Sequence, residues 1–330
     1  MRVCMLSDYQ SRTDEGVTNT AFHLAREISQ RHELLHVCLQ PYAKMLNPGY
    51  WATIRKFNPH IIHFVPGPTI KSFLIVRWAG FLCPGAKTVM SGTHPALTSL
   101  SKRLVPFLTP DLVLAQSPES HGMFSDMGCR TSFLPSGVDL DKFAPVSEET
   151  RNKLRDKYGL PRDAWIALHV GPLKRGRNVL SLNRLVQEEV HVLIVGSLTV
   201  PWEPAVHRGL VEGGCTVWQR YFENVSDIYG LADCYIFPTT DKDNCIEMPL
   251  SIMEAMACNL PVLTTPFRAI PNLFPQGDGL HFFSGENGMV EAVKRIREGD
   301  IAPRTREKVA GYSWSAIGKQ LEEIYCEVAS

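Results

Sequence analysis

Length, composition and charge narrow the classes of protein that this sequence can encode. Its 330 residues suffice for two domains, and 44% hydrophobic with 21% charged residues is typical of a globular protein. The 34 basic and 34 acidic residues cancel, which excludes a general electrostatic attraction to nucleic acid. Nine scattered cysteines favour reduced thiols over disulfides or a zinc site. Because we find no export signal or membrane-spanning run, we expect a cytoplasmic protein.

The first half of the chain alternates short apolar runs with loops and helical patterns. An apolar run at 3–6 is followed by a polar loop that reaches Gly16, and apolar residues then recur at helical spacing over 17–28. Further apolar runs precede loops that contain glycine or proline, at 61–65, 88–90, 112–115 and 132–134. This alternation predicts a doubly wound parallel sheet, in which ligands bind at the carboxyl ends of the strands.

A second series of the same kind follows the charged stretch 148–162. Its apolar runs lie at 165–170, 190–195, 234–237 and 262–264. The pattern therefore predicts two α/β domains, 1–160 and 161–315. The chain closes with an amphipathic helix at 316–330, which we expect to pack on the N-terminal domain.

Residues 31–110 form a basic block within the electrically neutral chain. Nine lysines and arginines accompany one acid, Glu33, and aromatic residues such as Trp51 and Trp78 are interleaved with them. Cations mixed with aromatics suit the surface of an anionic membrane, which would make the protein peripheral on the inner face. A solvated basic face with ordinary core aromatics explains the same pattern. Both interpretations remain open.

A second candidate site is a helix that begins near Pro249. Proline is favoured in the first helical position, Asn259 suits the residue after the end, and Pro261 stops any continuation. The free amides of Leu250, Ser251 and Ile252 would bind an anion such as a diphosphate.

Glu254 lies in this helix among apolar residues. A carboxylate buried there needs partners, because an unpaired buried charge is costly. Hydroxyl groups of a sugar or ribose would satisfy it, and so would an arginine from another strand. The local pattern does not choose between these partners.

Several motifs in fixed order carry a resemblance to a known family. They are a glycine loop at Gly16, PSGVDLDKF at 135–143, HVGPLKRGRN at 169–178, ADCYIFPT at 232–239, PLSIMEAMACNLPVL at 249–263 and YSWSAIGKQLEEIY at 312–325. They resemble glycosyltransferase family four, the retaining enzymes with a GT-B fold of two Rossmann-like domains. The resemblance implies transfer of a sugar from a nucleoside diphosphate donor to a glycan or lipid-linked acceptor. It implies no cofactor or required metal, and no nucleic-acid partner is expected.

The resemblance also implies which residues form the site. Glu254 would bind the donor ribose, and Ile246 stands where the family has its first glutamate; Glu247 and Asp243 are the available substitutes. Expected catalytic residues are His94, Lys174, Arg175 and Glu247. Expected donor-binding residues are Gly16, Gly171, Arg177, Asn244, Met248, Pro249, Leu250, Ser251 and Glu254.

Two departures from the family pattern keep other functions open. Pro172 replaces the usual arginine, so the cations Lys174, Arg175 and Arg177 would together neutralise the leaving diphosphate. Ile246 replaces the first glutamate. A sugar-nucleotide epimerase, a phosphorylase or a non-catalytic nucleotide-sugar-binding module are therefore alternatives to a transferase.

Overall fold

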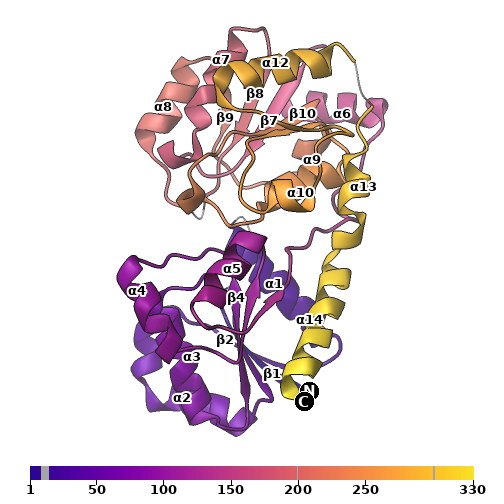
Figure 1. Ribbon diagram of the computed structural model, residues 1–330. Coiled ribbons are helices and arrows are strands. Elements are labelled where there is room, and N and C mark those ends of the chain that lie inside the picture. The colour runs from indigo at the N-terminus through magenta and orange to yellow at the C-terminus, as the bar shows by residue number, and fades with distance from the viewer. Residues whose placement is uncertain (9–14, 199, 300–301) are drawn as a thin grey trace. The chain divides into compact units, whose positions relative to one another are not determined.

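A computed structural model describes residues 1–8, 15–198, 200–299 and 302–330, and it divides the chain into two compact units (Figure 1). Unit 1 comprises Met1–Gly137, Ile246–Met248 and Trp314–Ser330, and unit 2 comprises Val138–Cys245 and Pro249–Ser313. The second unit thus begins before residue 148, whereas the charge pattern predicted a boundary at 160. Most of the stretch 148–162 forms helix α6 (Glu148–Tyr158) of unit 2, and its residues Arg151 and Arg155 pair with Asp233 of the same unit.

Unit 1 is built on a parallel six-stranded sheet in the order β2-β1-β3-β4-β5-β6. Its strands are β1 (Arg2–Leu6), β2 (Glu33–Val37), β3 (Ile61–Phe64), β4 (Lys87–Gly92), β5 (Leu112–Ala115) and β6 (Thr131–Phe133). Its helices are α1 (Gly16–Ser29), η1 (Tyr42–Leu46), α2 (Pro48–Phe57), α3 (Ile70–Leu82), α4 (Ser99–Leu104), η2 (Val105–Phe107), α5 (Pro118–Asp126) and α14 (Trp314–Ala329). The polar loop expected before Gly16 lies largely outside the described residues.

The order of the strands decides which helices share a face of this sheet. Connections between parallel strands are right-handed, so the crossovers that step from β3 to β4 to β5 to β6 lie on one face. α2, α3, η2 and α5 accordingly contribute to one apolar cluster with the strands, through residues such as Ile54, Phe73, Val105 and Phe124. The connection from β1 to β2, which contains α1, runs in the opposite direction along the sheet. α1 therefore lies on the other face, where it packs with α14.

The closing helix α14 is anchored to unit 1 by buried groups. The ring of His63 in β3 lies between the Tyr325 hydroxyl, 2.6 Å from Nδ1, and the Ser91 hydroxyl, 2.8 Å from Nε2. Gly318 allows α14 to approach α1, because a Cβ at this position would lie 2.6 Å from Cβ of Glu27. His63 is fully buried, which lowers its pKa to about 3.

Unit 2 repeats the architecture with a parallel sheet in the order β12-β11-β10-β7-β8-β9. Its strands are β7 (Ile166–Val170), β8 (His191–Val195), β9 (Thr216–Trp218), β10 (Cys234–Phe237), β11 (Val262–Thr264) and β12 (Leu280–Phe282). Its helices are α6 (Glu148–Tyr158), η3 (Arg175–Arg177), η4 (Val179–Leu182), α7 (Asn183–Val186), α8 (Pro204–Glu212), α9 (Val225–Gly230), η5 (Lys242–Asn244), α10 (Leu250–Ala257), α11 (Ile270–Leu273), α12 (Gly285–Arg297), α13 (Thr305–Val309) and η6 (Ala310–Tyr312).

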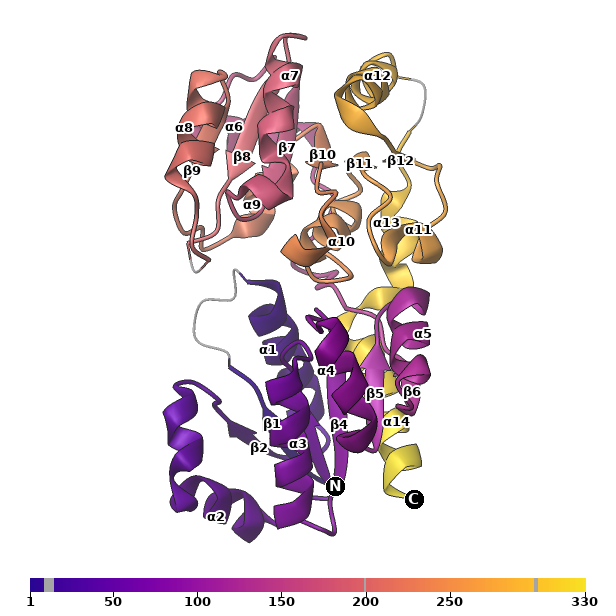
Figure 2. The same ribbon diagram turned by 60° about the vertical axis from the view of Figure 1, so that its left-hand side comes forward.

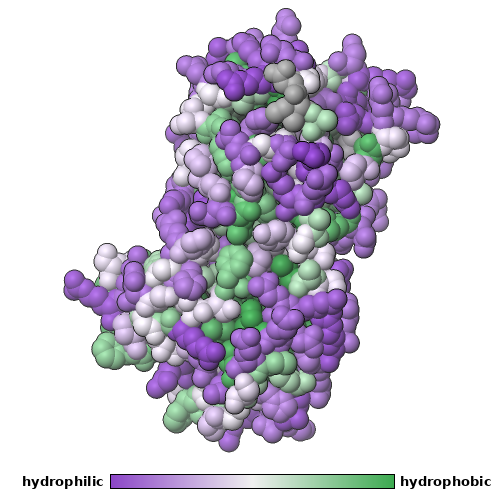
Figure 3. Space-filling view, turned by 45° about the vertical axis from the view of Figure 1, so that its right-hand side comes forward, coloured by the Kyte–Doolittle hydropathy of each residue, from purple (hydrophilic) through white to green (hydrophobic). Residues whose placement is uncertain are grey.

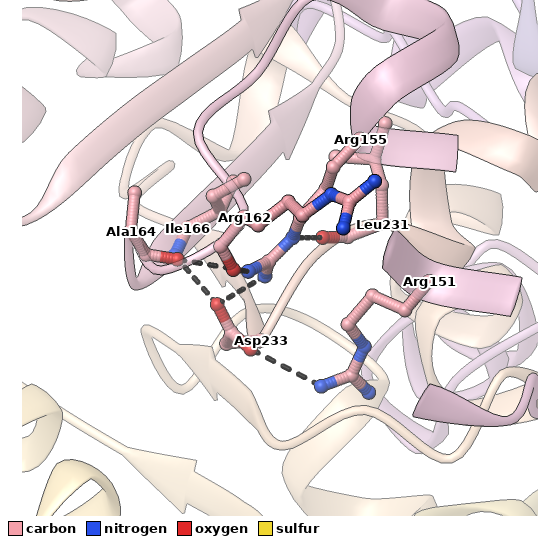
Figure 4. Close-up of polar contacts among 7 residues, drawn as sticks. All are labelled: Arg151, Arg155, Arg162, Ala164, Ile166, Leu231 and Asp233. Atoms are coloured by element: carbon pink, nitrogen blue, oxygen red, sulfur yellow. Dashed lines mark hydrogen bonds and ion pairs between the residues drawn. The ribbon is translucent and has the colours of Figure 1, made fainter. Parts of the chain in front are cut away.

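A buried ionic network holds α6 against the sheet of unit 2 (Figure 4). Arg155 is 4% exposed and pairs with Asp233 at 2.7 Å. Arg151 adds a second ion pair to the same carboxylate at 3.2 Å. The remaining partners are backbone groups: Arg155 donates to the carbonyl oxygens of Arg162, Ala164 and Leu231, and the amide of Ile166 donates to Asp233. Because each nitrogen of the Arg155 guanidinium has a partner, this buried arginine is tolerated.

One face of the molecule is mostly polar (Figure 3), and the cysteines of the chain are unpaired. The face drawn in Figure 3 is mostly hydrophilic, with hydrophobic residues interspersed. All nine cysteines are free thiols; Cys38 and Cys326, both in unit 1, are exposed, and the other seven are buried. Among the residues that the structure describes, no helix is long and apolar enough to cross a membrane.

Candidate active site

The helix α10 begins one residue later than the sequence predicts. Pro249 is its N-cap rather than its first helical residue, and no side chain caps the helix. The amide of Ile252 donates to the Pro249 carbonyl at 3.2 Å, so the prediction of three free amides is wrong for this residue. The amides of Leu250 and Ser251 lie in the first turn, where no intrahelical carbonyl is within reach, so they can face an anion.

Ser251 is held in place by a tyrosine of the neighbouring strand. The Tyr235 hydroxyl donates to Ser251 Oγ at 2.7 Å and lies 3.4 Å from the Val170 carbonyl oxygen. Burial raises the pKa of Tyr235, so this phenol keeps its proton. Since Ser251 Oγ accepts from the tyrosine, its own proton is free to be donated toward the start of α10.

Arg177 of η3 lies beside the carboxyl ends of the central strands. Burial lowers the pKa of His169 and raises that of Tyr235; the positive charge of Arg177 adds to the first shift and opposes the second. The Nε atom of Arg177 is buried and has no hydrogen-bond partner among the described residues. Gly171 lies beside this arrangement: a Cβ there would make an ordinary contact with Nη1 of Arg177 at 3.6 Å and a tight one with Nε2 of His169 at 3.2 Å. A half-buried guanidinium with a buried, vacant Nε donor suits an anionic ligand.

His169 is a site residue that the sequence analysis did not single out. The ring is fully buried at the end of β7, and Nδ1 donates to the Ile236 carbonyl at 2.8 Å. Burial lowers the pKa of His169 to about 4, and the hydrogen bond to the carbonyl opposes that shift. The ring is therefore neutral at pH 7, and Nε2 is a bare acceptor without a partner among the described residues. The only signal in the sequence is its place at the end of an apolar run.

The other two cations of the predicted cluster lie in different surroundings. The side chain of Arg175 is 75% exposed, and its Nε lies 3.9 Å from a Glu203 carboxylate oxygen. Lys174 is half-buried at the start of η3. Asn244 packs on this turn, because a Cβ on Gly176 would lie 2.1 Å from its amide nitrogen. Only Arg177 among these cations lies beside the buried strand ends.

Glu254 is half-buried on α10, and its partner is a tyrosine. The Tyr229 hydroxyl donates to Oε2 of Glu254 at 2.6 Å. Burial raises the pKa of Glu254, while this hydrogen bond and the nearby charge of Lys142 oppose the rise. No arginine forms an ion pair with Glu254 in the part of the chain that the structure describes, so the arginine alternative is not observed.

Two expected catalytic residues, His94 and Glu247, belong to unit 1. His94 is half-buried in the loop after β4. Glu247 is 1% exposed; its carboxylate accepts from the Ser117 hydroxyl at 3.1 Å, and its amide donates to the Thr93 carbonyl at 3.0 Å.

Gly16 and Met248 also belong to unit 1. Gly16 begins α1, and a Cβ there would lie 2.9 Å from Cδ1 of Ile246. Ile246 therefore packs against the start of α1. Met248 is buried, and its sulfur accepts a hydrogen bond from the amide of Ser136 at 3.2 Å.

Carboxylates near the site do not gather into a metal-binding cluster. In the described ranges, no three histidine, cysteine, aspartate or glutamate side chains are grouped as metal ligands. Asp241 instead caps the short helix η5, accepting from the amide of Asp243 at 2.9 Å and from Asn244 Nδ2 at 2.6 Å.

Known proteins resemble the chain in the segment that contains this site. A model of the family described as glycosyl transferases group 1 matches residues 174–298. Residues 174–298 are therefore similar to the group 1 glycosyltransferases. The matched segment contains Arg177, Ser251 and Glu254. His94 and Gly16 lie outside it.

Relatives and solved structures bear the glycosyltransferase name as well. A Bacillus subtilis protein named as a teichuronic acid biosynthesis glycosyltransferase is 29% identical over 53% of this chain and 43% of its own length. The phosphatidyl-myo-inositol mannosyltransferase of Propionibacterium freudenreichii is 28% identical over 44% of this chain and 37% of its own. The chain spans about half the length of the curated relatives it matches.

The fold is shared with solved structures over nearly the whole chain. Anabaena HepE, solved in complex with UDP, aligns with a TM-score of 0.76 at 17% identity and covers 99% of this chain and 100% of its own. The two α/β units, each with a parallel sheet and helices on both faces, are those of the GT-B fold.

Proposed function

We propose that this chain transfers a sugar from a nucleoside diphosphate donor to an acceptor, with retention of configuration at the anomeric carbon. The observation that carries the proposal is the vacant donor atom of Arg177, buried beside strand ends in a segment of glycosyltransferase type. In the same unit, Ser251 and the amides of the first turn of α10 supply further donors for an anion. A diphosphate is the anion that this combination suits.

These groups have defined roles in the proposed reaction. As the bond between the anomeric carbon and the phosphate oxygen breaks, negative charge develops on the leaving diphosphate. Arg177 and the amides of Leu250 and Ser251 stabilise that charge. The Glu254 carboxylate, oriented by Tyr229, accepts hydrogen bonds from ribose hydroxyls. No cofactor is part of this proposal, and metal independence is testable by adding a chelator.

The donor and acceptor are proposed by class. HepE was solved with UDP, so UDP-sugars come first in a donor panel that also includes GDP- and ADP-sugars. Relatives are named for lipid and polysaccharide products, which supports a lipid-linked or glycan acceptor.

Substitution of Arg177 tests the proposal. We expect Arg177→Ala to lower kcat/KM by about 100-fold, because a charged donor to the leaving group is lost, and Arg177→Lys to restore part of it. Arg175→Ala should have a much smaller effect. The matched control is Arg208→Ala, which removes an exposed arginine of α8. Activity is measured as UDP released in the presence of acceptor.

Three outcomes would contradict the proposal. Equal rates for the wild type and Arg177→Ala would show that this arginine does not act in the reaction. Tight UDP-sugar binding by calorimetry, without turnover on any acceptor, would favour a non-catalytic binding module. Product formation without acceptor, or only with inorganic phosphate, would indicate an epimerase or a phosphorylase.

A further inference from the structure

α3 is apolar on the side that faces solvent as well as on the side that faces the core. Phe73, Val76 and Ala79 are buried against the sheet, whereas Leu74, Trp78 and Phe81 are exposed. These exposed residues recur at i, i+4 and i+7, so they form one stripe along the helix. Phe81 is 73% exposed, and its ring stacks on Trp78 at 5.6 Å. A helix that is apolar all round normally has a partner on every side.

The next connection along the chain repeats this pattern. Leu100 and Leu104 of α4 and Phe107 of η2 are exposed, again at i, i+4 and i+7. Phe107 is 77% exposed. The direction of the crossovers places α3 and the α4–η2 segment on the same face of the sheet, and Figures 1 and 2 both show α3 and α4 side by side. We call their combined outer surface the α3/α4 face.

Cations surround these apolar side chains. Lys71 and Arg77 on α3, and Lys102 and Arg103 on α4, are all exposed. None of the four takes part in an ion pair among the described residues. No acidic residue occurs in the sequence between Glu33 and Asp111. The face therefore combines exposed aromatic and aliphatic groups with unneutralised positive charge.

We propose that the α3/α4 face docks on the surface of an anionic lipid bilayer. Trp78, Phe81 and Phe107 would enter the boundary between headgroups and acyl chains, and the cations would contact lipid phosphates. Charge complementarity favours an anionic membrane over a protein partner, because an ordinary protein interface is depleted in lysine. The proposal does not depend on the chain's catalytic activity.

Vesicle co-sedimentation of the full chain tests the proposal. Sucrose-loaded vesicles contain either phosphatidylcholine alone or phosphatidylcholine with 30% phosphatidylglycerol, a composition chosen to give a negative surface. We expect binding to the anionic vesicles only. The variant Trp78→Ser/Phe81→Ser should bind at least about tenfold more weakly. Each of Lys71→Gln, Arg77→Gln, Lys102→Gln and Arg103→Gln should weaken binding by about fivefold.

Control variants separate this face from general surface effects. Lys319→Gln removes an exposed cation of the same unit on α14, which covers the opposite face of the sheet, and Val211→Ser removes an exposed apolar residue of unit 2. Neither should change vesicle binding. The substituted residues are exposed, and circular dichroism checks that each variant is folded.

Three results would overturn the proposal. Equal sedimentation with neutral and anionic vesicles would show that charge does not drive binding. Unchanged binding by Trp78→Ser/Phe81→Ser would show that the α3/α4 face does not contact the membrane. Sedimentation velocity showing a dimer that this variant dissociates, without vesicle binding by the wild type, would assign the face to a second copy of the chain.

Discussion

At the residue scale, Glu254 combines a partly buried carboxylate with a single tyrosine donor. Burial raises its pKa, and the hydrogen bond from Tyr229 limits that rise. A carboxylate with a raised pKa takes up a proton as the pH falls through that value, and it then accepts hydrogen bonds less strongly. The affinity for the donor should therefore decline on the acid side, starting above the ordinary pKa of glutamate.

Tyr229→Phe should move this decline to higher pH. The substitution removes a hydrogen bond that favours the ionised carboxylate, so the pKa of Glu254 rises further. Calorimetric Kd values for UDP between pH 5 and 8 measure the shift. Glu254→Gln is the control, since it has no proton to exchange. The phosphates of UDP titrate in all three proteins, so comparison among them isolates the glutamate. A common pH profile for all three would contradict the assigned role.

The three cations at η3 show why the role of each site residue was harder to predict than its membership of the site. The motif at 169–178 places Lys174, Arg175 and Arg177 in one turn. The resemblance predicted catalytic roles for Lys174 and Arg175 and a donor-binding role for Arg177. Which one points to the strand ends depends on the φ and ψ angles of a short 3₁₀ turn and on the position of Glu203, a residue distant in the sequence. Neither property can be obtained from local spacing.

At the element scale, one carboxylate, Asp233, pairs with two arginines of α6, Arg151 and Arg155. Asp233→Ala would leave Arg155 buried without its counter-charge, and we expect a loss of about 3–5 kcal/mol in the free energy of unfolding. Urea titration followed by far-ultraviolet circular dichroism measures the change. Asp156→Ala is the control. Asp156 lies in the same helix and forms a solvent-exposed ion pair with Arg162, so its loss should leave the urea midpoint almost unchanged. Equal effects of the two substitutions would contradict this role of the network.

The strands that the sequence predicted are mostly those with neighbours on both sides. Runs at 61–65 and 234–237 correspond to β3 and β10, which are fully buried. The strands that were not predicted, β2, β9 and β12, all lie at sheet edges. An edge strand is only partly covered, so its sequence lacks a continuous apolar run. Among the edge strands only β6 was anticipated, because a loop with proline and glycine follows it.

At the scale of the whole molecule, unit 1 is assembled from separated parts of the chain. A fragment of residues 1–137 contains every strand of its sheet but lacks α14. The face that α14 covers would be exposed, and His63 would lose its partner Tyr325. We therefore expect this fragment to aggregate or to remain partly unfolded.

Unit 2 should behave differently, because residues 138–313 contain its complete sheet in one continuous piece. We expect this fragment to fold and to bind UDP. Circular dichroism and calorimetry test both fragments, and adding residues 314–330 as a peptide should restore structure to the first. Cooperative unfolding of the 1–137 fragment without that peptide would show that α14 is dispensable.

The distribution of thiols has a practical consequence for spectroscopy. Maleimide dyes react with accessible thiolates, and Cys38 and Cys326 are exposed while every cysteine of unit 2 is buried. Mild labelling of the native protein would therefore mark unit 1 alone. With Cys326 replaced by serine, a cysteine introduced on the surface of unit 2, for instance by Val211→Cys, would leave one accessible thiol in each unit. A donor–acceptor dye pair on these two thiols would report the distance between the units in solution, with and without UDP.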